Sequence, residues 1–393
     1  MANRKILILL ALINFTNILD FMVMMPLGPQ LKRIFDLDPG DWSYLISSYA
    51  LAAFVSGVIS IFYIDKYDRK KFLLITYGLF IGGTFLCAIA ESFEILLLGR
   101  IVAGFFGGTI ASSVLAIVGD TTPPEKRATA MGIVMAGFSA AAALGVPFGI
   151  YFGTLFNWHM PFYAIVIVGL ITTALIYFVI PNITSHIAEG GKISGWTNIK
   201  TSLSDKNQFT ALIFMMVILF GQFSIVPFLS PYMVKNVGFT ENDLLYIYLF
   251  GGIISIFTSA MVGRLADQHG KIRIFTILLF LSLIPIIIVT HLGKTPIWIV
   301  LVITTSFFIF AGGRMIPASA VVLATADPKS RGAFMSIRSA IQQLGSGVAG
   351  IIAGMIITEN PNGSFENYPI VGYVAVFTSL LSLYLIRKID TKF

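Results

Sequence analysis

Asp20 is the only carboxylate deep inside one of the long apolar segments of this sequence. Insertion scales put the cost of a charge at a helix centre in a membrane at about 2.5–3.5 kcal/mol, so such a residue is by default functional. A membrane-embedded carboxylate can bind and release a proton, which predicts proton coupling. The competing interpretation is that Asp20 only caps a helix or hydrogen-bonds Asn14, Asn17 or a neighbouring helix.

Arg100 has the opposite charge at nearly the same expected depth. Asp20 follows Lys5 by fifteen residues, which is about 22 Å along a helix. Arg100 lies seven residues into a segment that runs the other way, so it lies roughly 20 Å from the edge at which the segment of Asp20 begins. We therefore expect Asp20 and Arg100 to form an ion pair.

Arg314 and Arg338 fall within later apolar segments, so three embedded arginines face one aspartate. A guanidinium binds a carboxylate or phosphate through two parallel hydrogen bonds, which predicts an anion site. Alternatively, each arginine bonds helix carbonyls, or Arg338 extends toward the aqueous edge. Neutral polar groups at similar depth either contact a substrate or join helices; they are Asn14, Asn17, Gln222, Gln342 and Gln343.

Composition excludes several classes of protein. The chain has 393 residues, 56% hydrophobic and 11% charged, whereas soluble domains are about 25% charged. In a soluble protein, a net charge of +7 would suggest a nucleic acid partner. In a membrane protein the positions of the cations along the chain matter more than their sum, so we expect no nucleic acid partner. One cysteine, Cys87, and four scattered histidines predict neither a metal site nor a cofactor. No hydrolase or metalloprotease motif occurs, so we do not expect an enzyme.

Twelve apolar stretches recur along the chain, each near the roughly 20 residues that cross a bilayer. They predict an all-α membrane protein with twelve transmembrane helices. The stretches lie at about residues 6–29, 42–64, 72–90, 95–118, 128–153, 160–180, 209–233, 244–263, 273–291, 296–325, 332–357 and 369–386.

The distribution of Lys and Arg predicts the orientation. If the N-terminus is cytoplasmic, nineteen cations fall in cytoplasmic segments, four fall outside and three fall within spans. By the positive-inside rule, this bias places both termini in the cytoplasm. We expect a multi-pass protein of a bacterial inner membrane, with the lipid bilayer as its surroundings.

The chain also divides into two similar halves. A polar stretch at 182–207 separates a predicted bundle at 1–181 from a second at 208–393. Charged turns at 65–70 and 267–271 are offset by 202 residues, and the segments that open with Arg127 and Arg331 are offset by 204. Two near-equal offsets indicate a parallel repeat of six plus six helices, an arrangement found in transporters.

Residues 263–271 match the loop signature G-x-L-x-D-x-x-G-[RK] of the Major Facilitator Superfamily, and the chain resembles that family over essentially its whole length. Segments 19–29, 145–149, 313–318 and 331–336, with Gln342 and Gln343, resemble its drug:proton antiporter and sugar-efflux branch, which includes the arabinose-efflux-like permeases. The resemblance implies the major facilitator fold and a monomeric secondary transporter that binds a small-molecule substrate and protons.

The sequence departs from the family pattern in places. In the first-half copy of the loop signature, Ile61 and Asp68 replace glycines, while Asp65, Arg69 and Lys70 match. Arg338 stands where related exporters often have a small or amide residue, and His159 where an arginine is common. These two departures leave the substrate class open.

Charged turns and small residues predict the parts that move. Oppositely charged groups at the cytoplasmic helix ends can hold the halves together and separate on opening, although they can also serve only to set topology. Glycines and a proline in the fifth segment allow close helix approach and a bend. The predicted gating residues are Asp65, Arg69, Asp120, Arg127, Gly145, Pro147, Asp267, Lys271 and Arg331.

The residues and the resemblance to the efflux branch together predict a proton-coupled exporter that works by alternating access. The alternative is a proton symporter or uniporter for uptake of sugars or organic anions. A channel is less consistent with a repeated two-half bundle. If Arg100 pairs with Asp20, the remaining embedded charge is positive, so we expect an anionic, zwitterionic or polyhydroxylated substrate. The many drug exporters of the resembling branch keep cationic drugs as the competing class.

Overall fold

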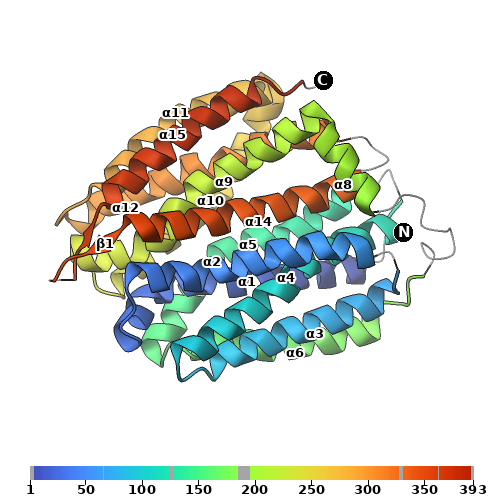
Figure 1. The fold of residues 1–393 in the computed structure, drawn as a ribbon, viewed down its shortest axis with the longest axis horizontal. Coiled ribbons are helices and arrows are strands. Elements are labelled where there is room, and N and C mark those ends of the chain that lie inside the picture. Colours follow the sequence, from blue (N-terminus) through green and yellow to red (C-terminus); the bar gives the residue numbers. More distant parts are fainter. Residues whose placement is uncertain are drawn as a thin grey trace.

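The computed structural model describes residues 4–64, 66–123, 127–184, 195–326, 331–361 and 363–390. In these residues the chain is helical except for its turns and one short hairpin (Figure 1). The hairpin pairs β1 (Thr358–Glu359) with β2 (Phe365–Glu366) in antiparallel register.

The described residues of the first half form six long helices. Their apolar composition and their length of 20–31 residues suit a membrane crossing. Side-chain caps begin several of them, since Asp38, Asp68 and Ser92 each accept a hydrogen bond from a backbone N–H of the following turn. The helices are α1 (Arg4–Ile34), α2 (Pro39–Tyr63), α3 (Arg69–Ala88), α4 (Phe93–Thr121), α5 (Arg127–Leu155) and α6 (Met160–Val179).

The second half repeats this order with two irregular helices. A π-helical turn, Met233–Val237, extends α9, and another, Phe308–Gly312, joins α12 to α13 within a single 28-residue span. The helices are α9 (Lys206–Tyr232), α10 (Asp243–His269), α11 (Lys271–Thr290), α12 (Ile297–Phe307), α13 (Met315–Ala324), α14 (Arg331–Ile356) and α15 (Tyr368–Ile386).

The predicted all-α membrane architecture is confirmed. Eleven helices of the described chain are long and apolar enough to cross a membrane, and α5, with 29 residues, stands between α4 and α6 as the twelfth long helix. The repeat also holds in the structure, because α3 and α11 begin 202 residues apart and α5 and α14 begin 204 apart.

The segment between the halves contains more regular structure than its polar sequence suggests. A ten-residue helix, α8 (Gly195–Ser204), occupies part of the predicted linker at 182–207. Asp205 then caps α9 by accepting hydrogen bonds from the backbone N–H groups of Asn207 and Gln208. The ten residues of α8 are too few to cross a bilayer.

The halves pack against each other mainly through α2 with α14, α5 with α10, and α1 with α9. One buried apolar cluster includes residues of both halves, among them Trp42 and Phe228. Two other clusters draw their buried residues from one half each, at 6–183 and at 211–389. Trp42 Nε1 also donates to the carbonyl oxygen of Pro227 across the interface, at 2.9 Å.

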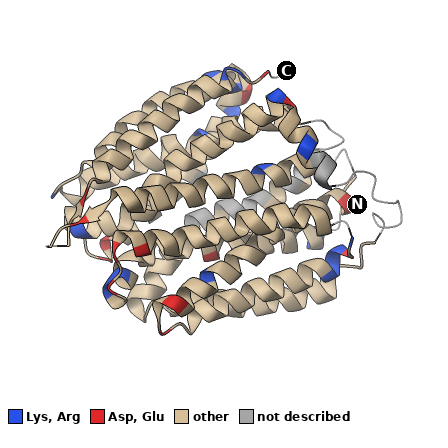
Figure 2. Cartoon of the chain, in the orientation of Figure 1, with Lys and Arg blue, Asp and Glu red and all other residues tan. Residues whose placement is uncertain are grey.

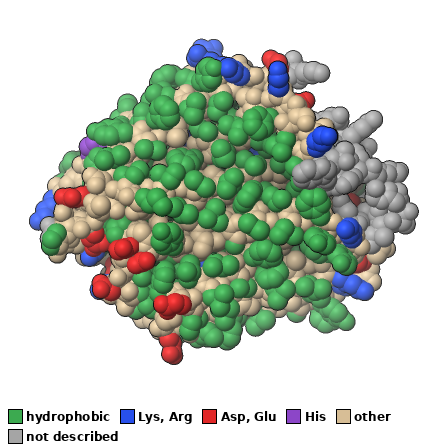
Figure 3. Space-filling view, in the orientation of Figure 1, with side chains coloured by type: hydrophobic (Ala, Val, Ile, Leu, Met, Phe, Trp, Pro, Cys, Tyr) green, Lys and Arg blue, Asp and Glu red, His purple; other side chains and the backbone are tan. Residues whose placement is uncertain are grey.

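The surface has the pattern of a membrane protein. Hydrophobic side chains cover the middle of the face in Figure 3, and charged side chains lie toward its ends. In Figure 2, most Lys and Arg gather at the end that holds both termini, while acidic side chains gather toward the opposite end. We call these the basic end and the outer end, and we predict that the basic end is cytoplasmic.

Reporter insertions test that orientation. A reporter inserted after Lys294, in the turn between α11 and α12, is expected to report the external side. One inserted after Asp205, between α8 and α9, is expected to report the cytoplasmic side. An alkaline phosphatase and fluorescent-protein pair gives opposite signals at the two positions, and the reverse pattern would contradict the positive-inside assignment.

Candidate transport site

Asp20 and Arg100 meet in the interior of the first half. Arg100 Nη1 lies 3.0 Å from Asp20 Oδ2, and both side chains are fully buried. The same Nη1 also donates to the backbone carbonyl oxygen of Asp20 at 3.2 Å. The structure thus brings together the two charges that the sequence places at one depth. Removing one partner of such a buried pair leaves an uncompensated charge, which costs about 3–5 kcal/mol.

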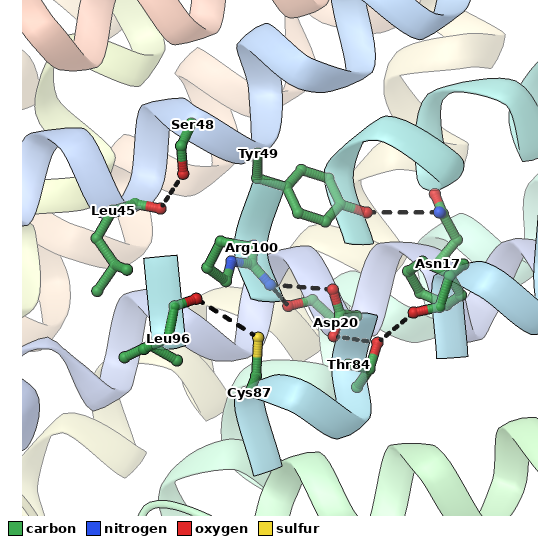
Figure 4. A network of polar contacts seen from close by, with 10 residues as sticks. Asn17, Asp20, Leu45, Ser48, Tyr49, Thr84, Cys87, Leu96 and Arg100 are labelled. Atoms are coloured by element: carbon green, nitrogen blue, oxygen red, sulfur yellow. Dashed lines mark hydrogen bonds and ion pairs between the residues drawn. The ribbon is translucent and has the colours of Figure 1, made fainter. Parts of the chain in front are cut away.

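Two neighbouring helices complete the surroundings of this pair (Figure 4). Thr84 of α3 donates to Asp20 Oδ1 at 3.0 Å. The Tyr49 ring of α2 lies 4.3 Å from the Arg100 guanidinium, and Asn17 Nδ2 lies 3.5 Å from the Tyr49 hydroxyl. A cation over an aromatic face is stabilised electrostatically. Sequence reasoning missed Thr84 and Tyr49, because only packing places their helices beside Asp20.

Glycines of α4 allow α2 to come this close. A Cβ at Gly104 would lie 2.3 Å from the carbonyl oxygen of Tyr49, and one at Gly108 would lie 2.3 Å from that of Ala53. Any larger side chain would push α2 away from α4. Arg100, one turn before Gly104, therefore reaches the Tyr49 ring because this part of α4 is free of bulk.

Arg314 is buried within the second half. It is 1% exposed and donates from Nη1 to Ser379 Oγ of α15 at 2.8 Å and to Ser282 Oγ of α11 at 3.3 Å. Among the described residues, neither α11 nor α15 makes an extended contact with a helix of the first half. These contacts favour a role for Arg314 in holding three helices of the second half together.

Arg338 lies on α14, the helix that packs along α2 of the first half. Its Nη2 donates to Ser319 Oγ of α13 at 2.7 Å, and its Nε has no hydrogen-bond partner in the described structure. Gln342 and Ser346 follow at four-residue spacing, so the three residues share one face of α14. Among the described residues, neither Arg338 nor Arg314 has an ion-pair partner.

The predicted neutral polar residues are distributed between the halves. Asn14 Nδ2 donates to the carbonyl oxygen of Val134 in α5 at 3.3 Å, so Asn14 joins two helices of the first half. Gln222 of α9 is half-buried, and its Oε1 accepts no hydrogen bond from the described part of the chain. Gln342 and Gln343 are also half-buried, and the Gln343 carbonyl accepts from Ser346.

Small residues of α5 allow α1 to pack closely on it. A Cβ at Gly145 would lie 2.8 Å from Leu19 Cδ1, and one at Gly149 would lie 2.6 Å from Val23 Cγ2. Pro147 lies between them, inside the helix. The structure therefore places Gly145 and Gly149 against the helix that carries Asp20, whereas the side chain of Pro147, two residues from each, points toward the other side of α5.

The predicted gating charges at the basic end have varied surroundings. Arg69 Nε lies 2.8 Å from Asp120 Oδ2, and this ion pair joins α3 to α4 within the first half. Asp267 is exposed near the end of α10, and Lys271 begins α11. The side chains of Arg127 and Arg331 and the whole of Asp65 lie outside the described residues.

Ion pairs at the outer end join the two halves, a feature that the sequence analysis did not identify. Lys32 Nζ of α1 lies 3.0 Å from Glu359 Oε2 of β1, and the Lys32 side chain is only 3% exposed. Arg33 Nη1 lies 2.9 Å from Glu241 Oε1, and Gln30 donates to Glu241 Oε2 at 2.8 Å. These contacts thus join α1 to the second half at the outer end. The sequence did contain a signal for these contacts, because Lys32 and Arg33 are adjacent and are two of only four Lys and Arg residues predicted on the outer side.

In the described part of the chain, no three His, Cys, Asp or Glu side chains lie close enough together to hold a metal ion. The polar groups instead form two sets, the Asp20–Arg100 network in the first half and the Arg338 face of α14 in the second. Both lie within membrane-spanning helices.

Comparisons with known proteins agree with this architecture. Relatives by sequence include the uncharacterized MFS-type transporter YceJ of Bacillus subtilis (strain 168), 26% identical over 92% of this chain and 90% of that protein. Another is a probable sugar efflux transporter of Helicobacter pylori (strain G27), 22% identical over 92% of this chain and 89% of that protein.

The fold is similar to that of a D-xylose-proton symporter, with a TM-score of 0.75 at 15% identity, covering 97% of each chain. The family model of the Major Facilitator Superfamily matches residues 10–313 and 211–392, which together span both halves. The twelve long helices of the described chain, the internal repeat and this match all support the same family assignment. The chain is a transporter of small molecules, not an enzyme, and belongs to the Major Facilitator Superfamily.

Proposed function

We propose that this transporter is a proton-coupled exporter that works by alternating access. The observation that carries the proposal is the fully buried Asp20–Arg100 ion pair. Protonation of Asp20 removes one charge of the pair and leaves Arg100 uncompensated, so the two protonation states favour different arrangements of α1 and α4. A proton that enters from one side can thus be exchanged for a substrate that leaves.

Alternating access requires the two ends to open in turn. Ion pairs and a shared apolar cluster join the halves toward the outer end in this structure. We propose that this is the inward-facing state and that the Lys32–Glu359 and Arg33–Glu241 pairs break when the outer end opens. Gly145 and Pro147 of α5, together with charges such as Asp267 at the basic end, would then govern the outward-facing state.

Direction of flux tests the export assignment. In inside-out vesicles with an acidic lumen, an antiporter is expected to accumulate substrate in the lumen, because efflux of protons drives substrate inward. A symporter is expected to expel preloaded substrate under the same gradient. Collapsing the gradient with a protonophore serves as the control. Accumulation that persists without the gradient would contradict proton coupling.

The charge that faces the substrate is proposed to be positive. Asp20 is occupied by Arg100, whereas Arg338 has no ion-pair partner among the described residues and shares a helix face with Gln342 and Ser346. A guanidinium without an acidic neighbour attracts a carboxylate or phosphate. We therefore propose an anionic, zwitterionic or polyhydroxylated substrate that contacts Arg338.

Arg338→Gln is expected to weaken binding of an acidic substrate by about 10- to 100-fold, the effect of losing a hydrogen bond to a charged group. Binding is measured on purified protein with small carboxylic acids, sugars and cationic dyes. Arg387→Gln, an exposed arginine just after α15, is the control and should leave affinity unchanged. Tight dye binding that is insensitive to Arg338→Gln would contradict a positive site.

A further inference from the structure

A second site lies on the flank of the first half, away from the transport residues. A cavity of about 480 Å³ opens between the basic ends of α3 and α6 and is lined by Lys70, Lys71, Leu74, Tyr177 and Asn182. The surrounding helix surfaces are apolar and outward-facing, since Ile75 is 61% exposed and Phe178 is 80% exposed. The cavity therefore lies at the boundary between lipid and the aqueous phase at the basic end.

The two lysines bring positive charge that no described carboxylate neutralises. Asp68, the nearest acid in sequence, accepts from the backbone N–H groups of Lys71 and Ile183, both at 2.9 Å. Asp120 is paired with Arg69. Among the described residues, no acidic side chain lies within ion-pair distance of either lysine Nζ. Asp68 and Asp120 thus bind other groups and do not form ion pairs with the two lysines.

The Lys70 side chain is also directed by α6. Lys70 Nζ lies 5.2 Å from the centroid of the Tyr177 ring, across the cavity from α3 to α6. Such a cation–aromatic contact holds the ammonium group near the cavity without neutralising its charge. Asn182 adds an exposed amide to the same lining. The cavity thus combines cations and hydrogen-bond donors on one side.

An open apolar column leads from these lysines into the membrane region. Leu74, Gly78 and Gly82 follow at four-residue spacing on α3, so they lie along one side of the helix. Apart from neighbouring residues and the nearby backbone of α3 itself, no atom of the described residues comes within 4 Å of the place where a Cβ would stand at Gly78 or at Gly82. This column leaves room along α3 for an apolar chain.

We propose that this cavity binds the phosphate of an anionic phospholipid from the adjacent leaflet, with Lys70 and Lys71 on the phosphate and an acyl chain along Leu74, Gly78 and Gly82. Basic pockets between transmembrane helices at the cytoplasmic side suit anionic headgroups. The bound lipid would stabilise the junction of α3 with the chain after α6, where Arg69 N donates to the Ile183 carbonyl oxygen at 3.2 Å.

Native mass spectrometry of the full-length purified protein tests the site with phosphatidylglycerol and phosphatidylcholine. The wild-type chain is expected to retain one phosphatidylglycerol in preference to phosphatidylcholine. Lys70→Gln/Lys71→Gln should weaken that binding about 30-fold, because each interfacial lysine contributes about 1 kcal/mol. Arg387→Gln/Lys388→Gln is the matched control. It removes two exposed cations at the same end, where Lys388 Nζ also lies 4.4 Å from an aromatic ring, that of Tyr384.

Each other outcome overturns the proposal. Equal losses in the two double variants would show unspecific surface charge, and equal retention of the two lipids in the wild type would show no anion preference. Displacement of the lipid by millimolar inorganic phosphate would identify a soluble-anion site. Gly78→Leu, which fills the apolar column, should weaken phosphatidylglycerol binding while the lysines remain; unchanged binding would refute the acyl-chain contact.

Discussion

Asp20→Asn is expected to abolish transport driven by a pH gradient while substrate exchange between the two sides persists. The amide keeps the shape of the carboxyl group and can still accept a hydrogen bond, but it cannot carry a proton. The carrier should therefore still change conformation with substrate bound and lose only its coupling to the gradient. Uphill transport and counterflow exchange, measured in the same proteoliposomes, separate these two activities.

Two controls show whether the variant is folded and whether the unpaired Arg100 charge lowers its stability. Asp20→Asn leaves Arg100 buried without its counter-charge, so retained counterflow shows that the variant is folded. Asp20→Asn/Arg100→Gln removes both charges and should recover part of the lost stability, because the uncompensated guanidinium disappears with its partner. Unchanged uphill transport in Asp20→Asn would contradict the assignment of the proton to this residue.

A disulfide between α2 and α14 near the outer end is expected to stop transport completely. A Cβ at Gly350 would lie 3.7 Å from the Cβ of Ser47, which suits a disulfide bond. In a Cys87→Ala background, oxidised Ser47→Cys/Gly350→Cys should hold the outer end closed. If transport requires that end to open, activity falls to background and returns on addition of a reductant.

The matched control places the same bond within one half. A Cβ at Gly221 of α9 would lie 3.5 Å from the Cβ of Thr378 in α15. If each half moves as a rigid body, oxidised Gly221→Cys/Thr378→Cys should transport at the rate of its reduced form. Full activity of the oxidised Ser47→Cys/Gly350→Cys variant, with crosslinking verified by mass, would contradict opening at this interface.

Local patterns in the sequence were sufficient to predict the long, membrane-spanning helices. Apolar runs of about 20 residues have few alternatives in a bilayer, since every backbone polar group must be satisfied within the segment. The predicted stretch at 273–291 became α11 (Lys271–Thr290), and that at 296–325 became α12, the π-helical turn and α13. α8 was not predicted, because it is short and lies outside the membrane segments.

Charge and depth predicted part of the candidate site. Helical rise alone placed Asp20 and Arg100 at one level, because a spanning helix converts sequence position into depth. Depth does not specify direction around the helix axis. In the sequence, Arg314 and Arg338 are equally good candidates for an anion site. In the structure, Arg314 binds serines inside the second half, whereas Arg338 lies on the helix that packs along α2.

By itself, the sequence determined the membrane environment, the two-half repeat and the charges that a bilayer makes costly, and it predicts the orientation. Only the tertiary structure decided which charges meet: Arg100 with Asp20, Lys32 with Glu359, and Lys70 with the ring of Tyr177. The reason is physical. Hydropathy and helical rise depend on neighbours along the chain, whereas these contacts join residues that packing brings together from different helices, as the close approach at Gly104 and Gly145 illustrates.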